Sequence, residues 1–202
     1  MKNTDKIFIG LLIGSVFPLL LSLLSVILWF YINRNTEWVL IYLSIGLILG
    51  FIIDFKFLKT WIIKRYELPI WFIIGMYIFY NIEIYGFFMG VPVVNILMGL
   101  IAGYYCGKKI EYENISPDKI PAVIKKNSLF TCLIMSLICL SSAVIALMDE
   151  STGENLRLMF SLNFPITKAM IFAIILFGGF ILILSQYFIT NLVMSKTIKS
   201  NS

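Results

Sequence analysis

Histidine is absent from this sequence of 202 residues, and charged residues are scarce, at 13% of the chain. The lack of histidine excludes histidine-based catalysis, histidine metal ligands and histidine pH switches. The three cysteines have no spacing typical of a disulfide framework or a metal site. Soluble domains have about 25% charged residues, so this chain has too few to cover a water-exposed surface.

Apolar residues fill the place of the missing charges. They make up 60% of the chain, and the mean hydropathy is +0.95. A transmembrane helix needs about 20 consecutive apolar residues, and the sequence contains runs of that length. We therefore predict an all-α integral membrane protein, a bundle of about six transmembrane helices in one domain covering 1–202. The expected spans are about 7–32, 38–55, 68–84, 87–107, 129–148 and 166–191.

A turn must interrupt the segment from Ile70 to Tyr105, which contains one charged residue, Glu83. As a single helix this segment would be about 54 Å long, well beyond a hydrocarbon core of about 30 Å. Asparagine and glycine near Glu83 are turn signals. The sequence therefore predicts a hairpin tip over 83–90, with Glu83 at the membrane boundary.

The positions of the basic residues predict the orientation. Thirteen of the 16 lysines and arginines fall in the two tails and the even-numbered connections of the six-span arrangement. We therefore expect a multi-pass protein of the cell membrane with both termini in the cytoplasm. Its basic inner face would contact the anionic headgroups of the lipid bilayer and not nucleic acid.

Glycines recur four residues apart, which places them on one face of a helix. Such faces let neighbouring membrane helices approach closely, either in rigid packing or at an interface that slides during transport. The glycines expected to pack helices are Gly10, Gly14, Gly46, Gly50, Gly99, Gly103 and Gly107.

Polar residues cluster around the predicted hairpin and form the candidate substrate site. A carboxylate at the edge of hydrocarbon is costly unless it is hydrated or paired, and Pro92 would free backbone carbonyls nearby. The alternatives are that Pro92 simply starts the fourth span and that Glu83 lies in a hydrated loop. The residues expected to hold a small polar or cationic solute are Tyr80, Asn81, Glu83, Tyr85 and Asn95.

Asp54 and Lys108 are the candidate inner gate, an ion pair at the cytoplasmic ends of two spans. The alternative for Asp54 is a solvated or paired boundary residue, because Lys56 and Lys59 follow it. Gln186 and Asn191, near the end of the sixth expected span, give a weaker signal.

No catalytic, metal-binding or cofactor-binding residue is predicted. The aspartates are solitary, and neither a P-loop nor a Gly-x-Ser-x-Gly motif occurs. We therefore expect a protein that is not an enzyme.

The leading function is transport of a small solute, by the chain alone or as the substrate-binding membrane subunit of a transporter. In size and expected span number the chain is similar to the substrate-binding subunits of energy-coupling-factor vitamin transporters. The alternative is a non-catalytic membrane scaffold or accessory subunit, with a partner membrane subunit or a second copy of itself. An enzyme acting on membrane lipids is the third reading, and the missing acid–base pair disfavours it.

Overall fold

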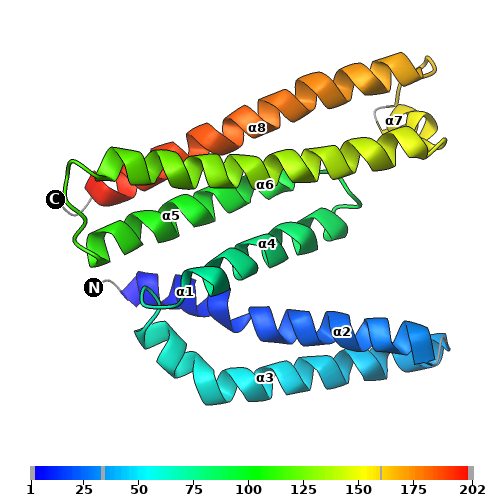
Figure 1. The fold of residues 1–202 in the computed structure, drawn as a ribbon. Coiled ribbons are helices and arrows are strands. Elements are labelled where there is room, and N and C mark those ends of the chain that lie inside the picture. Colours follow the sequence, from blue (N-terminus) through cyan, green and yellow to red (C-terminus); the bar gives the residue numbers. More distant parts are fainter. Residues whose placement is uncertain (1–2, 33–34, 160, 200–202) are drawn as a thin grey trace. The chain divides into compact units, whose positions relative to one another are not determined.

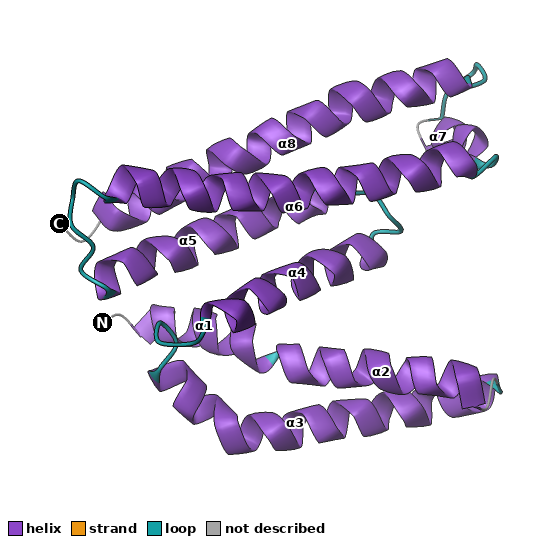
Figure 2. Cartoon of the chain, viewed as in Figure 1, coloured by secondary structure: helices purple, strands orange, loops and turns teal. Residues whose placement is uncertain are grey.

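The described part of the chain, residues 3–32, 35–159 and 161–199 of a computed structural model, is helical and contains no strand (Figures 1 and 2). The chain divides into two compact units, residues 1–76 and 77–202, called unit 1 and unit 2. The elements are α1 Asn3–Gly14, α2 Val16–Ile32, η1 Thr36–Trp38, α3 Val39–Ile63, α4 Ile70–Phe87, η2 Val94–Ile96, α5 Leu97–Tyr112, α6 Ile120–Met148, α7 Thr152–Met159 and α8 Lys168–Lys199.

Five helical segments of the described chain are long and apolar enough to cross a membrane. The helix α5, which falls in the fourth expected span, has 16 residues and is not among them. The described chain is thus helical, as expected from composition, and most of its long helices are apolar enough to cross a membrane. The five segments are Asp5–Ile32, Thr36–Ile63, Ile70–Phe87, Ile120–Met148 and Lys168–Ile198.

Unit 1 is built on the antiparallel pair α2 and α3, which approach each other at two glycines of α3 (Figure 1). A Cβ added at Gly50 would lie 2.5 Å from the backbone nitrogen of Pro18, and one added at Gly46 would lie 2.6 Å from Cα of Ser22. No side chain fits between backbones at those distances. The glycine spacing therefore sets how closely these two helices pack.

The first apolar run is one candidate span, but its helix is interrupted between α1 and α2 at Ser15. Pro18 explains the interruption. Proline has no N–H to donate to the carbonyl four residues earlier, which belongs to Gly14, and its ring clashes with that carbonyl. The Ser15 hydroxyl donates to the carbonyl of Leu11 at 2.7 Å.

The helix α3 continues to Ile63, past the expected end of the second span at residue 55. Lys56 and Lys59 do not end the helix, and both are exposed. Long lysine stems can lie along apolar surface while the ammonium group reaches water. Asp54 therefore lies within the helix and not at its end.

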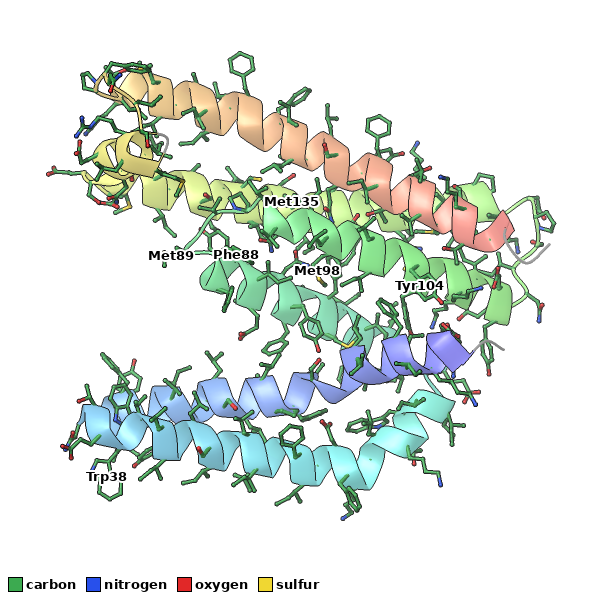
Figure 3. The ribbon with its side chains drawn as sticks, turned by 180° about the vertical axis from the view of Figure 1, so that it is seen from behind. Trp38, Phe88, Met89, Met98, Tyr104 and Met135 are labelled. Carbon is green, nitrogen blue, oxygen red and sulfur yellow. The ribbon has the colours of Figure 1, made fainter. Side chains whose placement is uncertain are left out.

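The turn after α4 falls in the last part of the predicted tip at 83–90, because α4 runs to Phe87 before the chain turns. Met89 and Gly90 take positive φ values of 54° and 81° and reverse the chain. Figure 3 shows Phe88 and Met89 at this turn. Glu83 is therefore inside the last part of a helix, where it is half-buried.

Unit 2 packs α5 and α6 against α8, and glycines of α5 face α8. A Cβ at Gly103 would lie 2.9 Å from the carbonyl oxygen of Thr190, and one at Gly107 would lie 2.8 Å from Cβ of Thr197. Met98 of α5 and Met135 of α6 are buried in this unit (Figure 3).

The segment before α6 also differs from expectation. Pro121 lies in the first turn of α6, where its missing N–H is not needed. The helix thus begins at Ile120 and is nine residues longer at this end than the fifth expected span, which began at 129. The short helix α7, between α6 and α8, was not anticipated.

Candidate functional site

The buried face of α4 begins the candidate site. Tyr77 and Asn81, one turn apart, are both buried, and the Asn81 side-chain amide donates to the carbonyl of Tyr77 at 2.9 Å. Tyr85, one turn further, shares this face. A Cβ at Gly90 would lie 3.3 Å from the Tyr85 hydroxyl, so Tyr85 lies against the turn that follows the helix.

Asn95 comes from the short 3-10 helix η2 that precedes α5. Its backbone N–H donates to the carbonyl of Pro92 at 3.2 Å, so the proline opens the turn that positions it. The Asn95 side chain is 0% exposed, and its Nδ2 donates to the backbone oxygen of Asn81 at 2.7 Å and to Oδ1 of Asn81 at 3.2 Å. Its own Oδ1 is buried and has no hydrogen-bond partner.

Gln186 of α8 is the third amide of the site, after those of α4 and η2, and is 1% exposed. In the orientation that satisfies both of its amide atoms, Nε2 donates to the carbonyl of Ile96 at 3.3 Å. Oε1 then accepts from the Tyr77 hydroxyl and from the N–H of Gly99, each at 3.1 Å. A Cβ at Gly99 would lie 3.2 Å from the Gln186 amide carbon, so a side chain there would push the Gln186 amide by a few tenths of an ångström.

Hydroxyl groups of α6 and α8 extend the polar region. Thr131 and Thr190 share a hydrogen bond of 3.0 Å, and Thr131 also donates to the carbonyl of Ser128 at 3.0 Å. The Ser128 hydroxyl is buried and has no partner. We call the whole set the amide–hydroxyl network: Tyr77, Asn81, Asn95, Gln186, Thr190, Thr131 and Ser128.

The structure brings together two of the five residues predicted for the site, Asn81 and Asn95. Tyr85 is on the same face of α4 but further along it. Tyr80 and Glu83 are half-buried and point elsewhere, because successive helical residues rotate by about 100°. The network therefore contains amides and hydroxyls and no charged group, and nothing in it favours a cation.

The gate residues are placed separately. Asp54 lies in unit 1, and Lys108, in unit 2, pairs with Glu111 at 2.9 Å. An ion pair between Asp54 and Lys108 stays a prediction. The Asp54 side chain is buried, which contradicts the alternative in which it is solvated.

Sequence reasoning missed most of the network. Gln186 was noted only as a weak signal, and the hydroxyl groups and Tyr77 were not noted at all. One signal was present, since Gln186 and Thr190 lie one turn apart on one face of a long and mostly apolar segment. A second missed cluster lies in unit 1, where Arg65 pairs with Asp5 at 3.1 Å.

This cluster ties the start of α1 to the connection after α3. Arg65 and Asp5 are 2% and 5% exposed, and the Tyr66 hydroxyl lies 3.2 Å from both carboxylate oxygens of Asp5. Burial lowers the pKa of Arg65, but hydrogen bonds to Tyr66 and Asp5 outweigh it, so the pKa is raised. Burial raises the pKa of the Tyr66 hydroxyl, which is therefore neutral.

The network can hold a molecule through hydrogen bonds but has no group that would act as an acid, a base or a nucleophile at neutral pH. Within the described residues, no group of three or more cysteines, aspartates and glutamates is arranged to hold a metal ion. No family model matches this chain, and no curated protein or solved structure matches it either.

Proposed function

We propose that the chain crosses the cell membrane six times, with both termini in the cytoplasm. The helical path over η2 and α5 supports the sixth crossing. It covers residues 94–112 and is about 30 Å long, close to the thickness of the hydrocarbon core. Lys108 and Lys109 at its end suit an interface, and the bias of basic residues supports the orientation.

We propose further that the chain binds a small, uncharged polar solute in the amide–hydroxyl network, as a transporter or its substrate-binding subunit. The observation that carries this proposal is the Oδ1 atom of Asn95, fully buried and without a hydrogen-bond partner. An unsatisfied buried acceptor costs about 1–3 kcal/mol. A solute N–H or O–H group that bonds to it would recover that free energy.

The depth of the network also supports a solute site. Gln186 is about 27 Å along α8 from Lys168 and about 20 Å from Lys199, so it lies inside the span. Polar side chains also join membrane helices without binding anything. Such structural contacts are expected to be satisfied among themselves, and Asn95 and Ser128 are not.

A membrane scaffold is the second candidate function. Gly86 of α4 and Gly178 of α8 favour it, because a Cβ at either would meet no atom within 4 Å. Glycine faces that are open in the chain could receive a partner helix or a second copy. A stable complex measured by light scattering in detergent, with no response to any solute, would favour this candidate over transport.

A thermal-shift experiment tests solute binding. The purified full chain is melted with a panel of uncharged solutes that carry amide or hydroxyl groups, including urea, glycerol and nicotinamide. A bound solute at 100 times its Kd should stabilise the wild type by about 2.7 kcal/mol. Asn95→Ala removes the acceptor, and we expect about tenfold weaker binding, which corresponds to about 1.4 kcal/mol.

Asn191→Ala is the matched control, because Asn191 is a half-buried amide of α8 outside the network. It should bind like the wild type. The proposal is contradicted if a stabilising solute binds equally well to Asn95→Ala and Gln186→Ala. It is also contradicted if no uncharged solute of the panel stabilises the folded wild type.

A further inference from the structure

Asp54 is a buried carboxyl group with no role in the amide–hydroxyl network. Its side chain is 5% exposed, and Oδ1 has no hydrogen-bond partner. No lysine or arginine in the described part of unit 1 forms an ion pair with it. Lys56 and Lys59 of the same helix are exposed and lie on other faces.

Asp54 faces the interruption between α1 and α2. A Cβ added at Gly14 would lie 3.8 Å from Oδ2 of Asp54. The carbonyl of Gly14 also receives no hydrogen bond from Pro18, because proline has no N–H. The carboxyl group thus meets α1 at the residue whose backbone oxygen lost its helical donor.

An ionised carboxylate without a cation is costly inside a membrane protein, and the neutral acid is not. The acid also has an O–H group that can donate, and Gly14 offers an acceptor on the neighbouring helix. A hard metal cation takes about six oxygen ligands. At Gly14 the structure instead places the apolar side chain of Leu58 beside the Asp54 carboxyl group, so a proton fits this site better than a metal ion.

We propose that Asp54 is a reversible proton-binding site at the junction of α1, α2 and α3. The proton comes from water when α3 packs against the junction and returns to water when the helices separate. In transporters, interrupted helices at membrane depth hold protons and coupling ions in this way. This inference stands on unit 1 alone and does not depend on the proposed solute site.

The other titratable groups of the elements around Asp54 are hydrogen-bonded to other residues, exposed, or distant from Asp54. On α1, Asp5 is held by Arg65 and Tyr66, and Lys6 is exposed. Tyr31 of α2 is exposed, and Tyr42 of α3 lies about three turns from Asp54. The part of α4 in unit 1 contains no titratable residue. A titration at the junction is therefore assigned to Asp54.

Infrared spectroscopy of the full chain in lipid vesicles tests the proposal. At pH about 6, water-exposed carboxyl groups are ionised, since their reference pKa values are about 3.9 and 4.3. We expect the wild type to retain the C=O stretching band of a protonated carboxylic acid and Asp54→Asn to lose it. Asp118→Asn, which removes an exposed carboxylate, should keep the band.

A second measurement follows thermal stability. The wild type should lose stability as pH rises from about 4, the reference pKa of aspartic acid, to about 7, because the charged form fits the packed junction poorly. Asp54→Asn is always neutral, so its stability should fall less over this pH range. The Asp118→Asn control should lose as much stability as the wild type. Asp54→Glu keeps an ionisable carboxyl group and should show the acid band at a displaced frequency. It therefore tests the site even if Asp54→Asn does not fold.

Three results would overturn the proposal. The first is absence of the acid band from the folded wild type at pH about 6, since Asp54 would then be ionised. The second is persistence of the full band in Asp54→Asn or its loss from folded Asp54→Glu. The third is stabilisation by sodium chloride relative to choline chloride that depends on Asp54, which would assign the site to a metal cation.

Discussion

Gly50→Ala is expected to lower the free energy of unfolding by about 3 kcal/mol, the upper end of the cost of overpacking. The added Cβ would lie 2.5 Å from the backbone nitrogen of Pro18 and 2.8 Å from the carbonyl carbon of Phe17. Both neighbours are backbone atoms, so no side chain can rotate away. The helices α2 and α3 must separate along their length to make room, and a melting curve in detergent would measure the loss.

Gly86→Ala is the matched control, with the same substitution at a glycine that has open space around it. Alanine is the better helix former by about 1 kcal/mol, so this variant should be as stable as the wild type or slightly more stable. Equal melting midpoints for Gly50→Ala and Gly86→Ala would show that α2 and α3 do not touch at Gly50.

Arg65→Met should cost about 3–5 kcal/mol, because it leaves the carboxylate of Asp5 buried without its cation. Arg65 and Asp5 are both almost fully buried, and their ion pair is 3.1 Å long. Adding Asp5→Asn removes the carboxylate charge and keeps a polar group for Tyr66. The double variant should therefore recover most of the lost stability, and thermal or denaturant melting of all four chains gives the coupling free energy.

Lys64→Met removes the charge of the exposed residue next to Arg65, and we expect a change within about 0.5 kcal/mol. Simple additivity of Arg65→Met and Asp5→Asn, with no recovery in the double variant, would contradict a buried ion pair. The cluster would then contribute no more to stability than two independent surface residues do.

Composition and span length were enough to predict a helical chain with several helices long and apolar enough to cross a membrane, because these features do not depend on packing. Local rules also worked where the chemistry is local. Pro92, in the alternative where it starts the fourth span, opens the turn that leads into α5. The clustering of Asn81 with Asn95 followed from their positions on either side of one turn.

Long-range contacts were beyond sequence reasoning. Nothing in the spacing of Gln186 tells which helix it faces. Its contacts are with Tyr77 of α4 and Gly99 of α5. The expected second span ended at residue 55, and α3 runs on to Ile63, past the first lysine. The helix continues past it, since only the lysine ammonium group must reach water.

The proposed solute site requires α5 to cross the membrane, so the positions flanking α6 give the most direct measurement. Lys119→Cys and Glu150→Cys are introduced separately into a chain in which Cys106, Cys132 and Cys139 are replaced by serine, and intact cells are treated with an impermeant thiol reagent. Both positions are exposed. With six crossings, position 150 should react from outside and position 119 only after the membrane is opened. The reverse pattern, with 119 outside and 150 inside, would mean that α5 does not cross or that the whole chain is inverted, and either would contradict the proposed architecture.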